Sequence, residues 1–255
     1  KANGGSLTTN DASATSVGDQ DSVYQANTTA GFSIVTWSGS NGVNTMAHGL
    51  GAVPNVIIIK ARAGTEAWGV YHHKNTAAPE TDFLRLDTNA ATSDSTTLMN
   101  DTAPTSTIFT VADSGTANEI GKTYVSYQFA EKQGYSKFGI YIGNGNADGP
   151  FVYTGFSPSF IIQKRTDSTD DWYMWDRTRA LDSAGQGYLN RNDKYLLADT
   201  TGVQSTGAGF DFLSNGFKPR DTTAGYINAD TATYVYMAFA HQPFVTSGGV
   251  PCTAN

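Results

Sequence analysis

Residues 54–60 read Pro-Asn-Val-Ile-Ile-Ile-Lys, and residues 158–164, which lie 104 positions later, read Pro-Ser-Phe-Ile-Ile-Gln-Lys. At the same spacing, Trp-Gly-Val-Tyr at 68–71 has a counterpart in Trp-Tyr-Met-Trp at 172–175. Such short runs of β-branched and aromatic residues predict β-strands. Their return in the same order, at a period of about 100 residues, indicates a small domain that occurs twice and argues against a solenoid or a propeller blade.

A third pair of runs extends the repeat towards the end of the chain. Residues 124–130 recur at 234–240, with the spacing widened to 110, so loops between the strands have grown while the strands have kept their order. The first residues are rich in Ser, Thr, Asn, Asp and Gly and have few apolar anchors, which predicts a segment that does not fold alone. The expected parts are a polar N-terminal arm or linker (1–30), a first module (31–135), a second module (136–246) and a C-terminal tail (247–255).

The fold class follows from the pattern inside the strand candidates. Residues 83–86 and 107–111 alternate apolar and polar side chains, as half-buried antiparallel strands do. No stretch carries a sustained apolar stripe of helical period, and the longest helix expected is a turn or two near 177–184. We therefore expect an all-β fold of tandem duplicated, antiparallel β-sandwich or jelly-roll-like modules. The joint at 131–137 is so short that the modules are expected to pack as a rigid pair.

Composition and charge narrow the classes of partner. The 255 residues carry a net charge of −7 and contain no run of Lys or Arg, so we expect neither nucleic acid nor a membrane as a partner. The single cysteine, Cys252, cannot form an intrachain disulfide, and no cofactor, metal site or catalytic set is expected. No apolar run approaches the roughly 18 residues of a membrane-spanning helix. Because the chain begins with Lys1, we expect it to be processed or to be part of a longer product.

Two loop features are expected to be structural. His48 lies in a turn before the strand at 54–60 and corresponds to a position near Tyr153, so we expect it to order that loop. The Gly-rich stretch 143–150 lacks the Lys and following helix of a phosphate-binding loop, and it lacks the distal Glu of an EF-hand calcium loop. A tight turn that uses the positive φ of glycine is therefore the expected role of this stretch.

Positions that differ between the modules are the better candidates for a specific function. His72 and His73 end one strand, where neighbouring side chains point to opposite faces, and the second module has Asp176 and Arg177 in their place. Trp175 likewise corresponds to a different aromatic residue, and exposed aromatic rings can stack on sugars. We expect any ligand-binding surface to involve Trp175, Tyr71, His72, His73 and Asp176, with Trp175 as the ring that faces the ligand.

The acidic residues leave an enzymatic alternative open. Five aspartates gather in the second module: Asp170, Asp171, Asp176, Asp182 and Asp193. A glycosidase would need two carboxyl groups facing each other about 5 Å or about 6.5–9.5 Å apart, which sequence order does not reveal. Most of these residues lie in turn-like surroundings, so loop tips explain them better. There is also no Gly-x-Ser-x-Gly nucleophile elbow.

The ordered motifs resemble a family of repeated domains in structural and tail-appendage proteins of tailed bacteriophages, especially marine ones. The resemblance rests on motifs within 31–36, 48–51, 100–106, 129–139, 143–156, 211–218 and 238–240. It covers nearly the whole chain from Gly31 to Val250. Such family members look like C-terminal parts of longer phage proteins and are named by sequence rather than by activity. The resemblance therefore implies a virion context and supplies no catalytic residues.

These observations lead to a ranked set of expectations. The first is a non-enzymatic virion structural protein, a fibre, spike or surface-decorating component exposed on the particle, whose partners are other virion proteins and copies of itself in a symmetric homo-oligomer such as a trimer. The second is a carbohydrate-binding adhesin that recognises host surface glycans through loops on a rigid sandwich. A polysaccharide-degrading glycosidase ranks below both.

Overall fold

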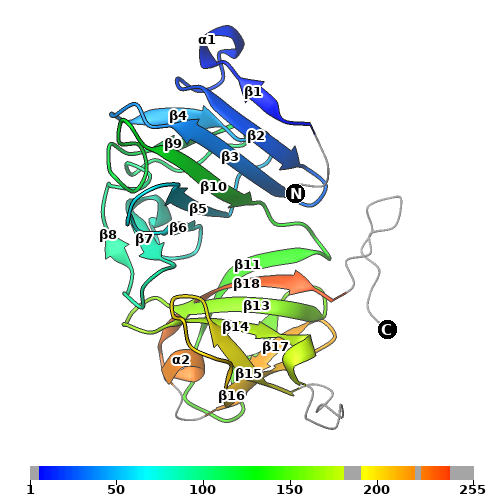
Figure 1. Ribbon diagram of the computed structural model, residues 1–255. Coiled ribbons are helices and arrows are strands. Elements are labelled where there is room, and N and C mark those ends of the chain that lie inside the picture. Colours follow the sequence, from blue (N-terminus) through cyan, green and yellow to red (C-terminus); the bar gives the residue numbers. More distant parts are fainter. Residues whose placement is uncertain (1–5, 181–190, 222–224, 242–255) are drawn as a thin grey trace. The chain divides into compact units, whose positions relative to one another are not determined.

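The computed structural model describes residues 6–180, 191–221 and 225–241, and antiparallel strands dominate it (Figure 1). The all-β prediction is confirmed, since the two α-helices of the described ranges have four residues each. The chain divides into two compact units. The first comprises Lys1–Asp87 and Thr92–Glu131, and the second comprises Thr88–Ala91 and Lys132–Asn255.

The first unit is built on an eight-stranded sheet with the order β1-β2-β3-β10-β5-β6-β7-β8. A separate two-stranded sheet, β4-β9, contributes Met46, Phe109 and Val111 to the same core as Val35 and Trp37 of β3, so this unit has two layers. Its elements are β1 (Thr8–Asn10), α1 (Ala12–Thr15), β2 (Ser22–Asn27), β3 (Phe32–Ser38), β4 (Asn44–Ala47), β5 (Val56–Ala61), β6 (Gly69–His72), the 3-10 helix η1 (Pro79–Thr81), β7 (Asp82–Arg85), β8 (Ser93–Asp94), β9 (Ile108–Val111) and β10 (Thr123–Phe129).

The second unit contains one eight-stranded sheet, β11-β18-β13-β14-β15-β16-β17-β12. This sheet curls around its own core, because Phe217 of β17 lies 5.8 Å from Tyr141 of β11 and 5.1 Å from Tyr236 of β18, ring centroid to ring centroid. Its elements are β11 (Ser136–Ile142), β12 (Val152–Tyr153), β13 (Pro158–Arg165), β14 (Trp172–Asp176), the 3-10 helix η2 (Arg177–Ala180), β15 (Arg191–Leu197), β16 (Ser205–Phe212), β17 (Gly216–Pro219), α2 (Gly225–Asn228) and β18 (Thr233–Ala240).

The two sheets share their central strand order. β3-β10-β5-β6-β7 in the first unit corresponds to β11-β18-β13-β14-β15 in the second. Tyr124 of β10 stacks on Trp37 of β3 at 5.4 Å, and Tyr234 of β18 stacks on Tyr141 of β11 at 4.8 Å. These equivalent strands and rings support the interpretation that the second unit repeats the first.

The hydroxyl groups of the same two tyrosines make equivalent hydrogen bonds. Each one donates to the carbonyl oxygen nine positions earlier and accepts from the backbone N–H five positions earlier. The partners are Gly115 and Glu119 for Tyr124, and Gly225 and Ala229 for Tyr234. Because each ring is buried, its hydroxyl requires such partners. These hydrogen bonds connect the loop before β10 or β18 to the core.

In the segment expected to be a polar N-terminal arm or linker, residues 8–27 add strands to the edge of the first sheet. β2 pairs with β3 from Val23↔Thr36 to Asn27↔Phe32, and β1 extends the same sheet by pairing with β2. Ser22 is buried, and its hydroxyl donates to the carbonyl oxygen of Ala47. The polar segment is therefore stabilised by an existing sheet edge rather than by a core of its own.

The remaining boundaries differ in detail from those expected. The units divide between Glu131 and Lys132, a few residues before the expected 135/136, and Thr88–Ala91 unexpectedly belongs to the second unit. The helix expected near 177–184 is the short η2 as far as Ala180, and the rest lies outside the described residues. The expected tail at 247–255 also lies outside them.

Candidate functional site

Trp175 is buried in the core of the second unit and does not face a ligand. Its side chain is 0% exposed, and its ring lies 5.1 Å from that of Tyr195 and 5.2 Å from that of Phe210. The prediction of a sugar-stacking Trp175 is therefore wrong. Trp175 and its counterpart Tyr71 are both core residues of their units.

The other predicted binding residues are not gathered into one site. His72 is buried, and Tyr71 belongs to the core of the first unit. His73 is partly exposed, and its Nε2 atom lies 4.0 Å from a carboxylate oxygen of Glu131. Asp176 of the second unit forms an ion pair with Arg179. These residues form local structural contacts within their own units, so the structure offers no support for a shared binding surface made from them.

His48 orders its loop, as expected. Its side chain is fully buried, its Nε2 atom lies 3.2 Å from the carbonyl oxygen of Thr105, and its Nδ1 atom accepts a hydrogen bond from the backbone N–H of Leu50. Burial lowers the pKa of His48 from its ordinary 6.5 to about 4, because the charged imidazolium would lose its hydration. The folded protein therefore holds His48 neutral.

This burial predicts acid sensitivity. The unfolded chain binds a proton at His48 below pH 6.5 while the folded chain does so only near pH 4, so the contribution of His48 to stability is lost as the pH falls through that window. We expect the unfolding free energy of the wild type to fall more steeply between pH 6.5 and 4 than that of His48→Asn, which keeps an acceptor for Leu50. Urea unfolding at a series of pH values measures this, with exposed His241→Asn as the control. Equal slopes for the wild type and His48→Asn would contradict the assignment.

The acidic cluster of the second module supports a hairpin. A carboxylate oxygen of Asp170 accepts hydrogen bonds from the backbone N–H of Asp171 and from the hydroxyl of Tyr173, and one of Asp199 accepts from the N–H of Trp172. The last bond has an equivalent in the first unit, where Asp87 accepts from the N–H of Trp68. Burial raises the pKa of Asp170 and of Asp199. These carboxyl groups shape turns; Asp182 lies outside the described residues.

Lys164 is fully buried beside this cluster, and its ammonium group donates to the carbonyl oxygens of Arg165 and Ser168. Lys60 in the first unit similarly donates to the carbonyl oxygen of Glu66. Burial lowers the pKa of Lys164 from 10.5 to about 8, against the attraction of Asp170. The lysine at the end of each repeated run thus closes the following hairpin.

The lowered pKa of Lys164 predicts a gain in stability at alkaline pH. Between pH 8 and 10.5 the unfolded chain retains the proton that the folded chain has released, so the unfolding free energy rises with pH in this window. We expect the rise to be smaller in Lys164→Met, and unchanged in Lys74→Met, whose lysine is exposed. Chemical unfolding from pH 7 to pH 10 measures the difference. If the unfolding free energy of Lys164→Met rises with pH as much as that of the wild type, Lys164 does not cause the rise.

The Gly-rich loop of the second unit is a tight turn, as expected. Asn144 and Asn146 direct their side-chain oxygens at backbone N–H groups two positions further on, and Asp148 forms ion pairs with Lys218 and Arg220. A side chain in place of Gly143 would bring its Cβ atom within 2.1 Å of the carbonyl oxygen of Ala229. The loop's oxygens are thus already used in holding its shape.

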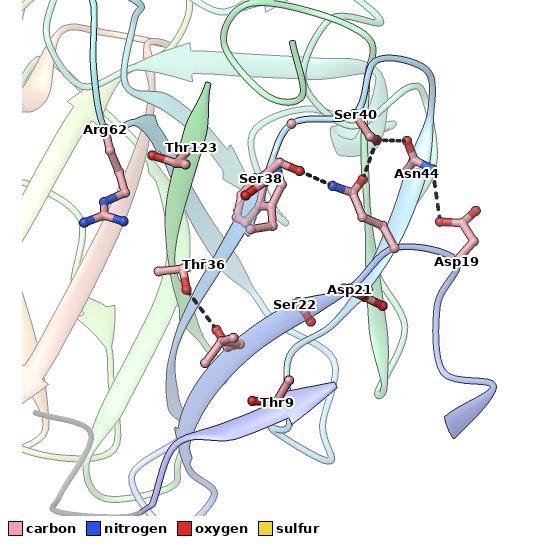
Figure 2. Close-up of a pocket in the computed structure, with 14 residues that line it drawn as sticks. Thr9, Asp19, Asp21, Ser22, Thr36, Ser38, Ser40, Asn44, Arg62 and Thr123 are labelled. Atoms are coloured by element: carbon pink, nitrogen blue, oxygen red, sulfur yellow. Dashed lines mark hydrogen bonds between the residues drawn. The ribbon is translucent and has the colours of Figure 1, made fainter. Parts of the chain in front are cut away.

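The first unit carries a groove of about 760 Å³ on its large sheet (Figure 2). The groove crosses β1, β2, β3 and β10 to the end of β5, strands that lie side by side in Figure 1. Thr36 and Ser38 form part of it, and their side chains lie on the face of β3 opposite to the buried side chain of Val35, so this part of the groove is on the face away from the core. Its lining residues are Thr9, Asp19, Gln20, Asp21, Ser22, Val23, Thr36, Trp37, Ser38, Gly39, Ser40, Asn44, Arg62 and Thr123.

One wall of the groove is held by a hydrogen-bond network. Gln20 donates from its amide nitrogen to the carbonyl oxygen of Ser38 and accepts from the hydroxyl of Ser40. A carboxylate oxygen of Asp19 accepts from the N–H of Thr45 at 2.5 Å. Gly18 permits this close approach, because its φ is +76° and an added Cβ atom would lie 2.5 Å from the carbonyl oxygen of Thr45.

Asn118 anchors the same wall from inside the unit. Its fully buried side chain donates from Nδ2 to the carbonyl oxygen of Gly42 and to Oδ1 of Asn44, and its Oδ1 atom accepts from the N–H of Ser40. Asn228 holds the Gly-rich loop of the second unit in the equivalent way. The scaffold is common to both units, but the side chains it presents to solvent are not.

The groove also contains polar groups that are not used by the fold. The hydroxyls of Thr9, Ser38 and Thr123 and the guanidinium of Arg62 make no hydrogen bond within the described part of the chain. Hydroxyl groups both donate and accept, and a guanidinium presents several donors in one plane. The groove can therefore form many hydrogen bonds with a polar ligand.

The groove does not follow from local sequence patterns, because its residues are far apart in the chain. Asp19 to Val23 lie in the segment expected to be an N-terminal arm or linker, and Arg62 and Thr123 lie in the first module. One signal was present, because Thr36, Ser38 and Arg62 correspond to Ile140, Ile142 and Thr166 at the repeat spacing of 104. These three positions are polar in the first module but not all polar in the second, and this difference indicates the sheet face that carries the groove.

The chain is thus an all-β protein with two antiparallel units and a polar groove on the first of them. Residues 6–243 match the domain of unknown function DUF7483, and the chain belongs to this family. Neither the curated proteins nor the solved structures include a match to it. Within the described ranges, no helix has the length and apolar character needed to cross a bilayer. Nor do three His, Cys, Asp or Glu side chains gather there as a metal site would require.

Proposed function

We propose that this protein is a non-enzymatic structural component of a tailed-phage particle, a fibre, spike or surface-decorating element exposed outside the particle. The observation that carries the proposal is the kind of residue that the two units have in common. Tyrosines, asparagines and lysines that bind backbone groups recur at equivalent positions, which is expected of a building element. The resemblance of the motifs to phage appendage proteins supports the same context.

Assembly with copies of itself is part of this proposal. A chain with one cysteine gains no stability from an intrachain disulfide, and symmetric association would stabilise it outside a cell. We expect light scattering after gel filtration to give a mass that is a multiple of 27.1 kDa, such as a trimer. Mass spectrometry of gradient-purified particles should detect its peptides. A monomer at micromolar concentration that is absent from purified particles would refute the structural role.

A second function, carbohydrate binding, is favoured by the groove of the first unit. Saccharides present closely spaced hydroxyls, and the groove offers unused hydroxyls together with carboxylate, amide and guanidinium groups. Such recognition places the ligand on loops and strand ends of a rigid sheet. A glycan array probed with the full chain tests this role, and Thr36→Ile/Ser38→Ile, which installs the side chains of the second unit, is the matched variant. Binding that the double variant leaves intact would exclude the groove.

A further inference from the structure

Arg62 is the only cationic residue among those that line the groove. It follows β5 directly, and its backbone N–H donates to the carbonyl oxygen of Thr123. Its side chain is exposed, and no carboxylate of the described ranges pairs with it. By contrast, Arg165, Arg179 and Arg220 each form an ion pair. An arginine in a groove without an internal partner retains its full capacity to bind an anion.

The other end of the groove has the opposite character. Figure 2 shows Asp19 and Asp21 on the far side of Thr36 and Ser38 from Arg62. One carboxylate oxygen of each is occupied, that of Asp19 by the N–H of Thr45 and that of Asp21 by the N–H of Ala12. The second oxygen of each accepts no hydrogen bond from the described residues. These carboxylates favour hydroxyl donors and repel anions.

The cation at one end of the groove and the carboxylates at the other indicate the chemical class of the ligand. We infer that the groove binds an acidic oligosaccharide, with a uronate carboxylate at Arg62 and the hydroxyls of neighbouring sugar units at Asp19 and Asp21. The planar guanidinium can form a bidentate pair with a carboxylate, and Figure 2 shows Ser38 and Thr123 between Arg62 and the two aspartates. This inference rests on the proposed carbohydrate-binding role and adds the class of sugar.

The second unit provides an internal comparison. Where the first unit has Thr36, Ser38 and Arg62, the second has Ile140, Ile142 and Thr166. Ile140 and Ile142 are 41% and 57% exposed, and β11 is an edge strand with no equivalent of β2 beside it in the described sheet. This face therefore has neither the cation nor the acidic wall, and we expect the acidic saccharide to bind only to the first unit.

The test compares a trigalacturonate with its methyl ester, which has the same size and hydroxyls but no charge. Calorimetric titration of the full chain should give binding of the acid, with affinity that falls as salt is added. Arg62→Gln should weaken that binding by about 10- to 100-fold, because it removes a charge-assisted pair. Arg191→Gln removes an exposed arginine of the second unit and should leave binding unchanged. Unfolding curves verify that both variants are folded.

Each other result has a definite meaning. If the ester binds as tightly as the acid and Arg62→Gln has no effect, the acidic specificity is refuted while carbohydrate binding stands. If the acid, the ester and a neutral oligosaccharide panel all fail to bind, both the specificity and the carbohydrate-binding role are refuted. Equal losses in Arg62→Gln and Arg191→Gln would indicate non-specific attraction by charge and would also refute the inference.

Discussion

Trp175→Ala is expected to destabilise the second unit by about 3–5 kcal/mol, which is the usual cost of removing a fully buried aromatic side chain. The ring is 0% exposed and lies against Tyr173, Tyr195 and Phe210, so its removal leaves a cavity that these rings cannot easily fill. We expect the change to lower the unfolding free energy and to leave saccharide binding in the groove of the first unit unaffected. Chemical unfolding measures the first effect and calorimetry the second.

The matched control is Tyr153→Ala, which removes an aromatic side chain that is 64% exposed on β12 of the same unit. Its cost should stay within about 0.5 kcal/mol, as for most surface substitutions. Trp175→Phe is informative as well, because the indole Nε1 atom has no hydrogen-bond partner in the described part of the chain. If the Trp175→Ala protein keeps its stability but no longer binds a glycan, Trp175 is a binding residue after all.

Asn118→Ala is expected to have the second large effect, a loss of about 2–3 kcal/mol that is combined with weaker binding in the groove. The buried amide satisfies the N–H of Ser40, the carbonyl oxygen of Gly42 and the side chain of Asn44 at once. Without the Asn118 amide, Ser40 and Asn44, which line one wall of the groove, lose the hydrogen bonds that hold them in place. Stability and affinity should therefore fall together.

The equivalent change in the second unit separates the two consequences. Asn228→Ala should lower the unfolding free energy by a similar amount, because it also removes a buried amide that donates several hydrogen bonds. It should not change ligand binding in the groove. Asn89→Ala, at an exposed asparagine whose side chain makes no hydrogen bond in the described ranges, serves as the control for the substitution itself. A binding defect of equal size in Asn118→Ala and Asn228→Ala would argue against a groove confined to the first unit.

The central strands of both units were predictable from the sequence. Runs such as 54–60 and 158–164 are long, apolar and β-branched, and both became inner strands, β5 and β13, whose position depends little on distant context. The loop-ordering role of His48 was also predictable, because the residue precedes a strong strand in a Gly-containing turn and its counterpart near Tyr153 is not a histidine. Local pattern was sufficient in these places.

Other features depended on contacts that no local pattern reveals. Residues 8–27 are polar but are stabilised by pairing with β3, a partner that composition does not indicate. Trp175 lies in β14, and the sequence of this strand does not reveal which of its two faces packs against the core. The curl of the second sheet buries the Trp175 side chain in that core. The groove joins residues from six separate stretches of the first unit, from Thr9 to Thr123. Their proximity comes from strand order, which is a property of the whole sheet.

The most direct test of the division of roles between the units is a titration of the ¹⁵N-labelled full chain with trigalacturonate, followed by amide chemical shifts. The predicted result is a set of shifts confined to the groove, at Gln20, Ser38, Arg62 and Thr123, with none at the corresponding face of the second unit. Saturation should occur at one ligand per chain. Shifts centred on Ile140, Ile142 and Thr166, or no shifts at ligand concentrations that saturate known lectins, would contradict a ligand site on the first unit.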